Sequence, residues 1–404
     1  PGPDAETEPD AEPGPDVAPA PDVTPESDAE PGPDAAPEPD AETEPDAETE
    51  PDAEPEPDAE TEPDAEPEPD AEPEPEPTCD ADLLTDPAHC GVCFHSCLGS
   101  ACVDGVCEPT TLAEGLTDPK GIAVHGDHVY WVDSDDGTVS RVAKAGGDVE
   151  VLATGAEGPL ELAVDDDGAY WVDFLGSAIG HVDLVDGTPE VFAETLGEPR
   201  GVALSATHVY WVTQTDGIVA GRSKSGGDVV TLSTLPGWPE IAAVSDTHVY
   251  WTDKYVGVVR RAPLDGGSGP ETLYASGDFP VGLALDAARI YWTDDVSGQV
   301  LSASHDGSGA TVLAEGQGGP WRIAADGGHV YWVNKMTGTV IAAPGGGGEL
   351  VVLAEGQQGA WGIAVDDAWV YWSAPGVIRR VARLAPEGDV EPDPCAACDD
   401  DDDG

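Results

Sequence analysis

The chain has 404 residues and a formal net charge of −67, with 82 Asp and Glu residues against 15 Lys and Arg. Such acidity argues against nucleic acid and anionic membrane surfaces as partners, because both require a positively charged footprint. Adaptation to high salt, in which negative charge maintains solubility, is an alternative explanation of the composition. The apolar runs are too short to span a bilayer, so no membrane span is expected.

Residues 1–77 contain 31 acidic residues and no Lys or Arg, and six copies of Pro-Asp-Ala-Glu-(Thr/Pro)-Glu run from Pro39 to Glu74. A segment with so little to bury and so much like charge is predicted to be disordered. Two interpretations stay open: a stalk that holds a domain away from a surface, and a solubilising spacer. The chain begins at Pro1 and has a single Met, so we expect a processed product, and a lipid anchor at the lost N-terminus would suit a stalk.

Residues 78–109 form a small cysteine-rich module, too short to hold a core without cross-links. Three disulfides are the favoured interpretation, with pairing unknown, and a zinc site that includes His89 and His95 is the rival. A further cysteine pair lies in residues 387–404, which are predicted to be a disordered acidic tail. The candidate disulfide cysteines are Cys79, Cys90, Cys93, Cys97, Cys102, Cys107, Cys395 and Cys398.

A Tyr-Trp pair recurs seven times between these segments, at spacings of 40 or 41 residues. Its tyrosines are Tyr130, Tyr170, Tyr210, Tyr250, Tyr291, Tyr331 and Tyr371. Each repeat has four short strand patterns separated by Gly and Asp, and an alanine stands seven residues before each Tyr. Small residues near an axis and bulky rings further out suit the wedge-shaped blades of a propeller.

The last repeat lacks its fourth strand, and Thr110–Ala113 before the first repeat matches the missing sequence. The two ends of the ring are therefore predicted to complete one blade together, which leaves no open edge at the closure. The expected fold is all-β, a monomeric seven-bladed β-propeller over residues 110–386.

The sequences Tyr250-Trp251-Thr252-Asp253 and Tyr291-Trp292-Thr293-Asp294 resemble the YWTD repeats of the low-density-lipoprotein-receptor propellers. The resemblance implies an extracellular binding propeller without enzymatic activity, secreted or at the outer cell surface. This chain has seven copies rather than the usual six and lacks the EGF-like module that follows in that family. The family's partner contacts are therefore not transferred.

Binding is expected at the mouth of the central channel, where loops that vary between repeats meet on one face. Trp, Tyr, Met and Arg, which are enriched in interface cores, gather in those loops, mainly in blades 4 to 7. The partner is expected to be a protein or a glycan, and the competing interpretation is that these side chains only plug the channel. The candidate ligand-binding residues are Lys120, Arg200, Trp238, Glu240, Lys254, Tyr255, Trp321, Arg322, Lys335, Met336 and Trp361.

No metal, cofactor or catalytic residue is expected. Four repeats carry a His two positions before the Tyr, which is better explained as a strand-entry residue than as a metal ligand: His128, His208, His248 and His329. The acidic loop Asp165–Asp167 lacks the spacing of a calcium loop. On the inner strands Glu161 and Glu240 look like isolated carboxylates, and one carboxylate alone makes a poor acid–base site. A lactonase-like or lyase-like propeller acting at the central channel, and a purely structural surface protein, are the alternatives.

Overall fold

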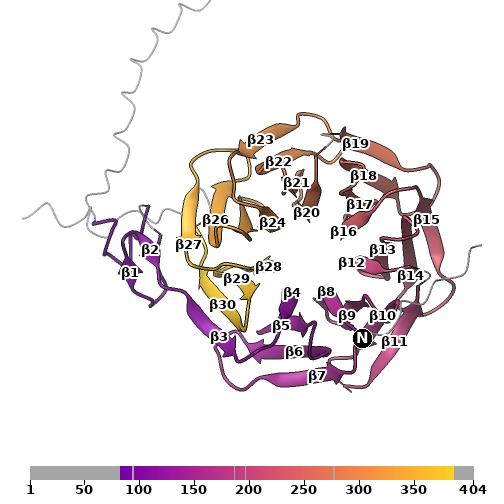
Figure 1. Cartoon of the computed structure of the whole chain (residues 1–404), viewed down its shortest axis with the longest axis horizontal. Helices are drawn as coiled ribbons and strands as arrows, with labels where there is room; N and C mark the ends of the chain where they lie inside the picture. Colours follow the sequence, from indigo (N-terminus) through magenta and orange to yellow (C-terminus); the bar gives the residue numbers. More distant parts are fainter. Residues whose placement is uncertain (1–81, 93–94, 186, 196, 276–277, 386–404) are drawn as a thin grey trace, which may run out of the picture. The chain divides into compact units, whose positions relative to one another are not determined.

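The computed structural model describes residues 82–92, 95–185, 187–195, 197–275 and 278–385, all within one compact unit, Pro75–Gly404. Seven four-stranded antiparallel sheets stand in a ring around a central axis (Figure 1), and we call the space along this axis the central channel. No helix of the described residues is long and apolar enough to cross a membrane. The predicted fold, an all-β propeller of seven blades, is confirmed.

Blades 1 to 6 are meanders that begin nearest the centre of the ring and move outward, and blade 7 adds β3 outside its three consecutive strands (Figure 1). The innermost strands are β4 (Pro119–His125), β8 (Pro159–Asp165), β12 (Pro199–Leu204), β16 (Pro239–Val244), β20 (Pro280–Leu285), β24 (Pro320–Ala325) and β28 (Ile363–Val365). The second strands are β5 (His128–Asp133), β9 (Gly168–Asp173), β13 (His208–Thr213), β17 (His248–Asp253), β21 (Arg289–Asp294), β25 (His329–Asn334) and β29 (Trp369–Ala374). The third strands are β6 (Thr138–Ala143), β10 (Ala178–Val182), β14 (Ile218–Ser223), β18 (Val258–Pro263), β22 (Gln299–Ser304), β26 (Thr339–Pro344) and β30 (Val377–Ala382). The outer strands of blades 1 to 7 are β7 (Glu150–Thr154), β11 (Pro189–Glu194), β15 (Val230–Thr234), β19 (Glu271–Ala275), β23 (Thr311–Ala314), β27 (Val351–Ala354) and β3 (Thr110–Glu114).

The Tyr-Trp pairs form the interfaces between blades. Tyr210 of blade 3 lies in one buried cluster with Trp251 of blade 4, and Tyr250 of blade 4 lies in the next cluster with Trp292 of blade 5. The same relation joins all seven neighbours, including the pair that closes the ring. The seven Trp side chains are at most 5% exposed. Because each cluster takes aromatic side chains from two blades, every blade is stabilised by both of its neighbours.

Closure follows the predicted scheme. β3 pairs antiparallel with β30, so that Thr110 faces Arg380 and Glu114 faces Val377. In addition, Lys144 Nζ of blade 1 lies 2.7 Å from Asp366 Oδ2 of blade 7. An N-terminal strand and an ion pair therefore both hold the closing blade.

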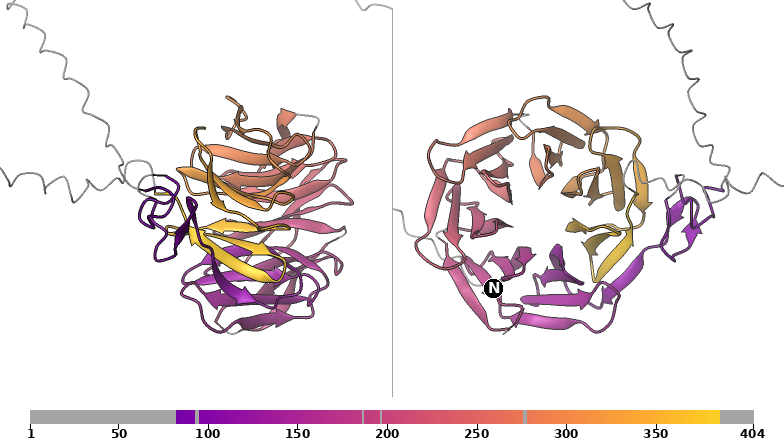
Figure 2. Two further views of the ribbon diagram at one scale, coloured as in Figure 1. Left: turned by 60° about the vertical axis from the view of Figure 1, so that its left-hand side comes forward. Right: turned by 180° about the vertical axis from the view of Figure 1, so that it is seen from behind.

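The cysteine-rich module contains the two-stranded hairpin β1 (Cys102–Val103) and β2 (Val106–Cys107). Disulfides join Cys90 to Cys102 and Cys97 to Cys107, which supports the disulfide interpretation over zinc. His95 is buried, with Nδ1 2.8 Å from the carbonyl oxygen of Cys90 and Nε2 3.3 Å from that of Ala382 in blade 7. The module therefore packs on the outside of the ring, beside β27 and β30, and Figure 2 shows it there.

The predictions for residues 1–77, for Cys79 and Cys93, and for the tail 387–404 with Cys395 and Cys398 lie outside the described residues.

Candidate functional site at the channel mouth

Two kinds of loop meet on one face of the ring, which we call the channel-mouth face. The loops that lead into the innermost strands accept hydrogen bonds from the turns between the second and third strands. In blade 4 the backbone N–H of Lys254 donates to the carbonyl oxygen of Trp238 at 3.2 Å, and in blade 6 Lys335 donates to Gly319 at 2.9 Å. The two loops of each blade are therefore fixed to one another around the mouth.

The Asp at the end of most second strands helps to hold the two loops of a blade together. Asp133 Oδ2 accepts the N–H of Thr117 at 2.9 Å, and Oδ1 accepts the N–H of Asp118 at 3.0 Å. Burial alone would raise the pKa of Asp133, but these hydrogen bonds and one from the Thr117 hydroxyl outweigh it and hold the pKa below its usual range. Asp253 accepts the N–H of Trp238 in the same way, at 2.9 Å.

A β-bulge opens the innermost strand of each of blades 1 to 6 directly after its proline. In blade 6, for example, Pro320 faces Asn334 while the next paired residue is Ile323, which leaves Trp321 and Arg322 without cross-strand partners. Bulges redirect side chains and are over-represented beside functional sites. The register shifts fall at the residues expected to surround the mouth, and they recur in blades 1 to 5.

Arg322 crosses the channel. Its Nε lies 2.6 Å from Glu161 Oε1, which joins β24 of blade 6 to β8 of blade 2 on the opposite side of the channel (Figure 1). Its Nη2 also lies 3.6 Å from Glu240 Oε1 of blade 4. One guanidinium therefore bridges two carboxylates that are far apart in the sequence. All three side chains are buried.

Glu240 is the most enclosed member of this network, with 0% exposure. Lys254 Nζ lies 2.6 Å from its Oε2, and Arg200 Nη1 lies 3.9 Å from its Oε1. The expectation that Glu161 and Glu240 are isolated carboxylates is therefore wrong, because Arg322 brings them into one network. Sequence separation alone gave no sign of this contact.

The two carboxylates have opposite pKa shifts. Burial raises the pKa of Glu161 above its usual value, although Arg322 partly opposes the shift. Burial also opposes ionisation of Glu240, but Arg322, Lys254 and Arg200 together outweigh it and hold the pKa of that carboxyl below its usual value. Glu161 therefore retains a proton to a higher pH than Glu240 does.

A second group at the mouth combines two indoles with two lysines. The rings of Trp321 and Trp361 are 5.1 Å apart between centroids and meet edge to face. Lys335 Nζ lies 4.3 Å from one centroid and 4.5 Å from the other, and Lys120 Nζ lies 4.3 Å from that of Trp361. Burial and the neighbouring charge of Lys120 lower the pKa of Lys335. Ammonium groups held over indole faces form cation–π contacts.

A third group lies at the rim. Trp238 and Tyr255 meet edge to face at 4.2 Å and are 43% and 61% exposed. Met336, in the equivalent turn of blade 6, is 69% exposed. The structure thus divides the eleven candidate residues into three sets: a buried charged network, a group of two indoles and two lysines, and an exposed apolar rim. The list of candidate residues did not include Gln214, whose Nε2 lies 3.4 Å from Glu240 Oε2, or Phe174, a residue of the mouth loops over which Arg200 lies at 4.6 Å.

One signal in the sequence could have indicated the network. The position two residues after the proline alternates around the ring between glycine and a larger residue, and blade 7, where Ala360 replaces the proline, continues the pattern with glycine. The residues are Gly121, Glu161, Gly201, Ile241, Gly282, Arg322 and Gly362. A Cβ on Gly121 would lie 2.7 Å from the Cα of Glu161, so the small residue is needed for close packing beside a large one.

The repeated histidines lie at the starts of second strands. His128, His208 and His248 each begin a second strand, as a strand-entry residue should. Within the described part of the chain, the one group of metal-binding side chains close enough to share an ion consists of Cys90, Cys97 and Cys102, which belong to disulfides.

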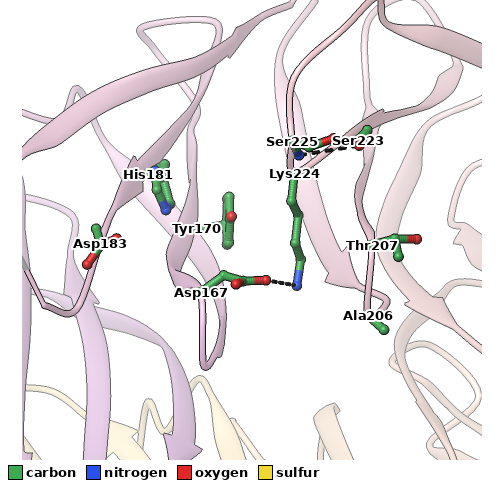
Figure 3. Close-up of a pocket in the computed structure, with 9 residues that line it drawn as sticks. All are labelled: Asp167, Tyr170, His181, Asp183, Ala206, Thr207, Ser223, Lys224 and Ser225. Carbon is green, nitrogen blue, oxygen red and sulfur yellow. Dashed lines mark hydrogen bonds and ion pairs between the residues drawn. The ribbon is translucent and has the colours of Figure 1, made fainter.

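The acidic loop Asp165–Asp167 is held by an ion pair on the face opposite the mouth. Lys224 of blade 3 contacts Asp165 and lies 3.2 Å from Asp167 Oδ2. Asp167 and Lys224 border a groove of about 510 Å³ between blades 2 and 3, shown in Figure 3, in which His181 stacks on Tyr170. Much of its charge is already paired within the protein, so it is a weaker candidate than the mouth.

No family model and no curated protein matches the chain. Similar solved structures include a streptogramin B lyase, with a TM-score of 0.60 and 15% identity over 68% of this chain and 96% of that chain. A catalytically inactive virginiamycin B lyase from Staphylococcus aureus with quinupristin has a TM-score of 0.60 and 14% identity over 69% and 99%. The computationally designed Ika8 protein has a TM-score of 0.53 and 14% identity over 68% and 98%. At these identities the similarity establishes the propeller fold alone.

The comparison corrects the expectation that this protein is not an enzyme. That expectation followed from the YWTD resemblance and from the apparent isolation of Glu161 and Glu240. Lyases are among the structures that share the fold at a TM-score of 0.60, and the two carboxylates belong to one network. Neither ground for excluding catalysis therefore stands.

Proposed function

We propose that the channel-mouth face binds an acidic ligand, carried by a protein or a glycan. The observation that carries the proposal is a local excess of positive charge in a chain of net charge −67. Five of its 15 Lys and Arg side chains gather at the mouth, and they are Lys120, Arg200, Lys254, Arg322 and Lys335. A cationic centre in an acidic protein attracts an acidic group to one place while the remaining surface repels it.

Counting charges supports this assignment. Five cations face the two buried carboxylates Glu161 and Glu240, a difference of 5 − 2 = +3. Adding Asp118, which lies 2.8 Å from Lys120, and Asp295, which acts on Lys335, leaves 5 − 4 = +1 for the side chains that contact the buried network or the two indoles. Asp133 and Asp253 at the ends of the second strands are outside this count, since Asp133 is held by backbone N–H groups and Asp253 pairs with Arg260 at 3.0 Å. A bound carboxylate, sulfate or phosphate would neutralise this excess.

Unpartnered donors at the mouth support the same conclusion. The buried Nε1 atoms of Trp321 and Trp361 and the Nε of Arg200 have no hydrogen-bond partner among the described residues. Buried donors are almost always satisfied, so such a group of exceptions indicates a polar guest. All three atoms donate, which suits an oxyanion. The acceptor Glu240 Oε1 also has no hydrogen bond, but it lies 3.6 Å from Arg322 Nη2 and 3.9 Å from Arg200 Nη1.

We further propose that the protein acts outside the cell as a YWTD-type propeller. The Thr252-Asp253 and Thr293-Asp294 endings of two repeats support the family assignment. The disulfides Cys90–Cys102 and Cys97–Cys107 support an oxidising compartment.

Calorimetric titration of the full chain with polyglutamate and with polygalacturonate tests the binding site and separates the two classes of ligand. The double variant Trp321→Ala/Trp361→Ala should bind at least about 30-fold more weakly, since roughly 2 kcal/mol marks a hot spot. Lys224→Ala, on the opposite face, is the matched control and should bind like the wild type. If neither polyanion binds at low salt, or if the double variant binds as tightly as the control, the proposal fails.

Acid–base catalysis at the same mouth is the second candidate function. The specific observation is the Glu161–Arg322–Glu240 network, in which two neighbouring carboxylates have pKa values shifted in opposite directions. Such a pair can supply a proton donor and a proton acceptor. Incubation with lactones and with acidic oligosaccharides tests it: turnover by the wild type that Glu161→Gln abolishes, with anion binding retained, would establish this function. If no substrate of either class is turned over, this second candidate is rejected and the binding proposal is unaffected.

A further inference from the structure

A row of three side chains crosses the outer part of each blade, from the Tyr of the second strand to the third strand and the outer strand. In blade 1 the row is Tyr130, Arg141 and Glu150, and in blade 4 it is Tyr250, Arg261 and Glu271. In blade 3 the same row is Tyr210, Gly221 and Val230. Blade 3 therefore lacks both members of an ion pair that blades 1 and 4 possess.

The arginine of this row connects neighbouring blades. In blade 4, Arg261 Nε donates to Glu271 Oε2 at 3.0 Å, and Nη1 donates to the carbonyl oxygen of His305 in blade 5 at 2.8 Å. In blade 7, Arg380 donates to the carbonyl oxygen of Lys144 in blade 1. His305 and Lys144 are each the first residue after a third strand, so Arg261 and Arg380 reach the same place in the next blade.

Most of the other blades place a different cationic or imidazole side chain in this position. His181 stacks on Tyr170 at 4.4 Å in blade 2, and Arg289 Nη2 donates to Ser302 Oγ at 2.6 Å in blade 5. Tyr331 of blade 6 interacts with Arg383 of blade 7. Within the described residues, no arginine lies against Tyr210. His208, on the same strand, stacks on Tyr210 with an interplanar angle of 23°. His128 and His248 are instead tilted by 53° and 52° against Tyr130 and Tyr250, the two tyrosines that also interact with an arginine.

The blade 3 position is a groove of about 460 Å³ between blades 3 and 4. Tyr210, Val230, Leu232 and Leu264 supply apolar walls, and Asp246 and Asp265 supply the acidic groups. Leu264 is the first residue after β18, so its carbonyl group corresponds to those of His305 and Lys144, which accept a guanidinium in the other blades.

We propose that the blade 3 groove binds an arginine side chain supplied by a partner polypeptide. The guanidinium would occupy the place that Arg261 fills in blade 4, against Tyr210 and near the Leu264 carbonyl, with Asp246 and Asp265 balancing its charge. A planar guanidinium stacks on an aromatic ring and donates in a fixed fork, whereas an ammonium is a compact point charge, so arginine is preferred to lysine. The groove lies on the face opposite the mouth and does not depend on the function proposed there.

The test is an NMR titration of the full chain with the peptide acetyl-Ala-Arg-Ala-amide, and with the same peptide carrying Lys or norleucine. The arginine peptide should bind at least tenfold more tightly than the norleucine peptide. The largest chemical-shift changes should come from residues around Tyr210. Agmatine, which has the guanidinium without a peptide backbone, separates a polypeptide ligand from a small free amine. Tighter binding of agmatine than of the arginine peptide would overturn the polypeptide assignment.

Two variants test the place of binding. Val230→Arg, at an exposed outer-strand position facing Gly221, should fill the groove from within and reduce binding at least tenfold. It is preferred to Gly221→Arg, because a Cβ at Gly221 would lie 2.6 Å from Cδ1 of Tyr210. Arg261→Gly should create a second groove and raise the stoichiometry from one to two. Equal binding of the arginine and norleucine peptides, or unchanged binding to Val230→Arg, overturns the proposal.

Discussion

Replacing Arg322 by Met should be one of the most destabilising single changes at the mouth, because the guanidinium bridges two buried carboxylates. Glu240 would keep Lys254 at 2.6 Å and Arg200 at 3.9 Å, whereas Glu161 would lose the cation at 2.6 Å and keep only a more distant interaction with Arg200. Removing one partner of a buried ion pair costs about 3–5 kcal/mol. We expect a loss of unfolding free energy in that range at pH 7, carried mainly by Glu161.

The loss of unfolding free energy in Arg322→Met should depend on pH, and the titration of Glu161 determines the direction of that dependence. Its folded pKa is already raised above the unfolded value, so its contribution to stability is full below the unfolded pKa and is lost as the pH rises through the folded pKa. Without Arg322 that folded pKa should rise further. The variant therefore loses less stability at a pH low enough for its Glu161 to hold a proton than at pH 7. The difference is up to about 1.4 kcal/mol for each pH unit over which Glu161 is protonated in the folded variant and ionised in the folded wild type.

Urea titrations at pH 5 and pH 7 measure this effect, and a double variant isolates it. Arg322→Met/Glu161→Gln should be more stable at pH 7 than Arg322→Met alone, because a neutral amide replaces the unpaired charge. Arg383→Met, which removes a cation from the opposite face, is the control and should not be rescued by Glu161→Gln. An equal cost at both pH values, or strictly additive variants, would refute the reasoning.

The remaining predictions concern the core, the closure and the module. Trp251→Ala should cost about 3–5 kcal/mol in denaturant titrations and Trp238→Ala much less, since the first is 1% exposed and the second 43%; equal costs would contradict the division into core and rim. Deleting Thr110–Ala113 should lower the melting temperature strongly, because β3 completes blade 7; an unchanged melting temperature would contradict the closure scheme. Burial alone would raise the pKa of Asp366, but the ion pair with Lys144 and backbone hydrogen bonds outweigh burial and lower that pKa. Asp366→Asn should therefore cost about 1.5–3 kcal/mol of unfolding free energy at pH 7, and nothing once the pH falls below the folded pKa of Asp366. A cost that persists in acid would exclude this ion pair. Mass spectrometry of the unreduced protein should find all six cysteines of residues 79–107 oxidised, and stoichiometric zinc would count against it.

The fold could be predicted because its determinants are periodic. A Tyr-Trp pair every 40 or 41 residues determines the number of blades. The bulk of the two aromatic side chains places each pair in the wedge between neighbouring blades. Thr110–Ala113 was identifiable as the closing strand because it repeats a sequence whose partner is missing elsewhere. Each of these inferences compares the chain with itself, and none requires a distance.

The mouth could be predicted only as a list of residues. Glu161 and Arg322 meet because blades 2 and 6 face each other across the channel, and that depends on the closed ring rather than on either repeat. The pairing of Cys90 with Cys102 was equally beyond reach, because several connectivities fit the same spacing. Charge partners across a ring and disulfide connectivity are both properties of the tertiary structure.

The odd number of blades gives the mouth its asymmetry. Glycine and a larger residue alternate at the second position after the proline, or after Ala360 in blade 7, but seven positions cannot alternate perfectly, so Gly121 of blade 1 and Gly362 of blade 7 are neighbours. A Cβ on Gly362 would lie 2.7 Å from the carbonyl oxygen of Lys120, which shows how closely these two innermost strands pack. Trp361 and Lys120, the residues directly before these glycines, lie together at this junction. The sevenfold repeat therefore provides one distinct site at the channel mouth, and the group of two indoles and two lysines lies there.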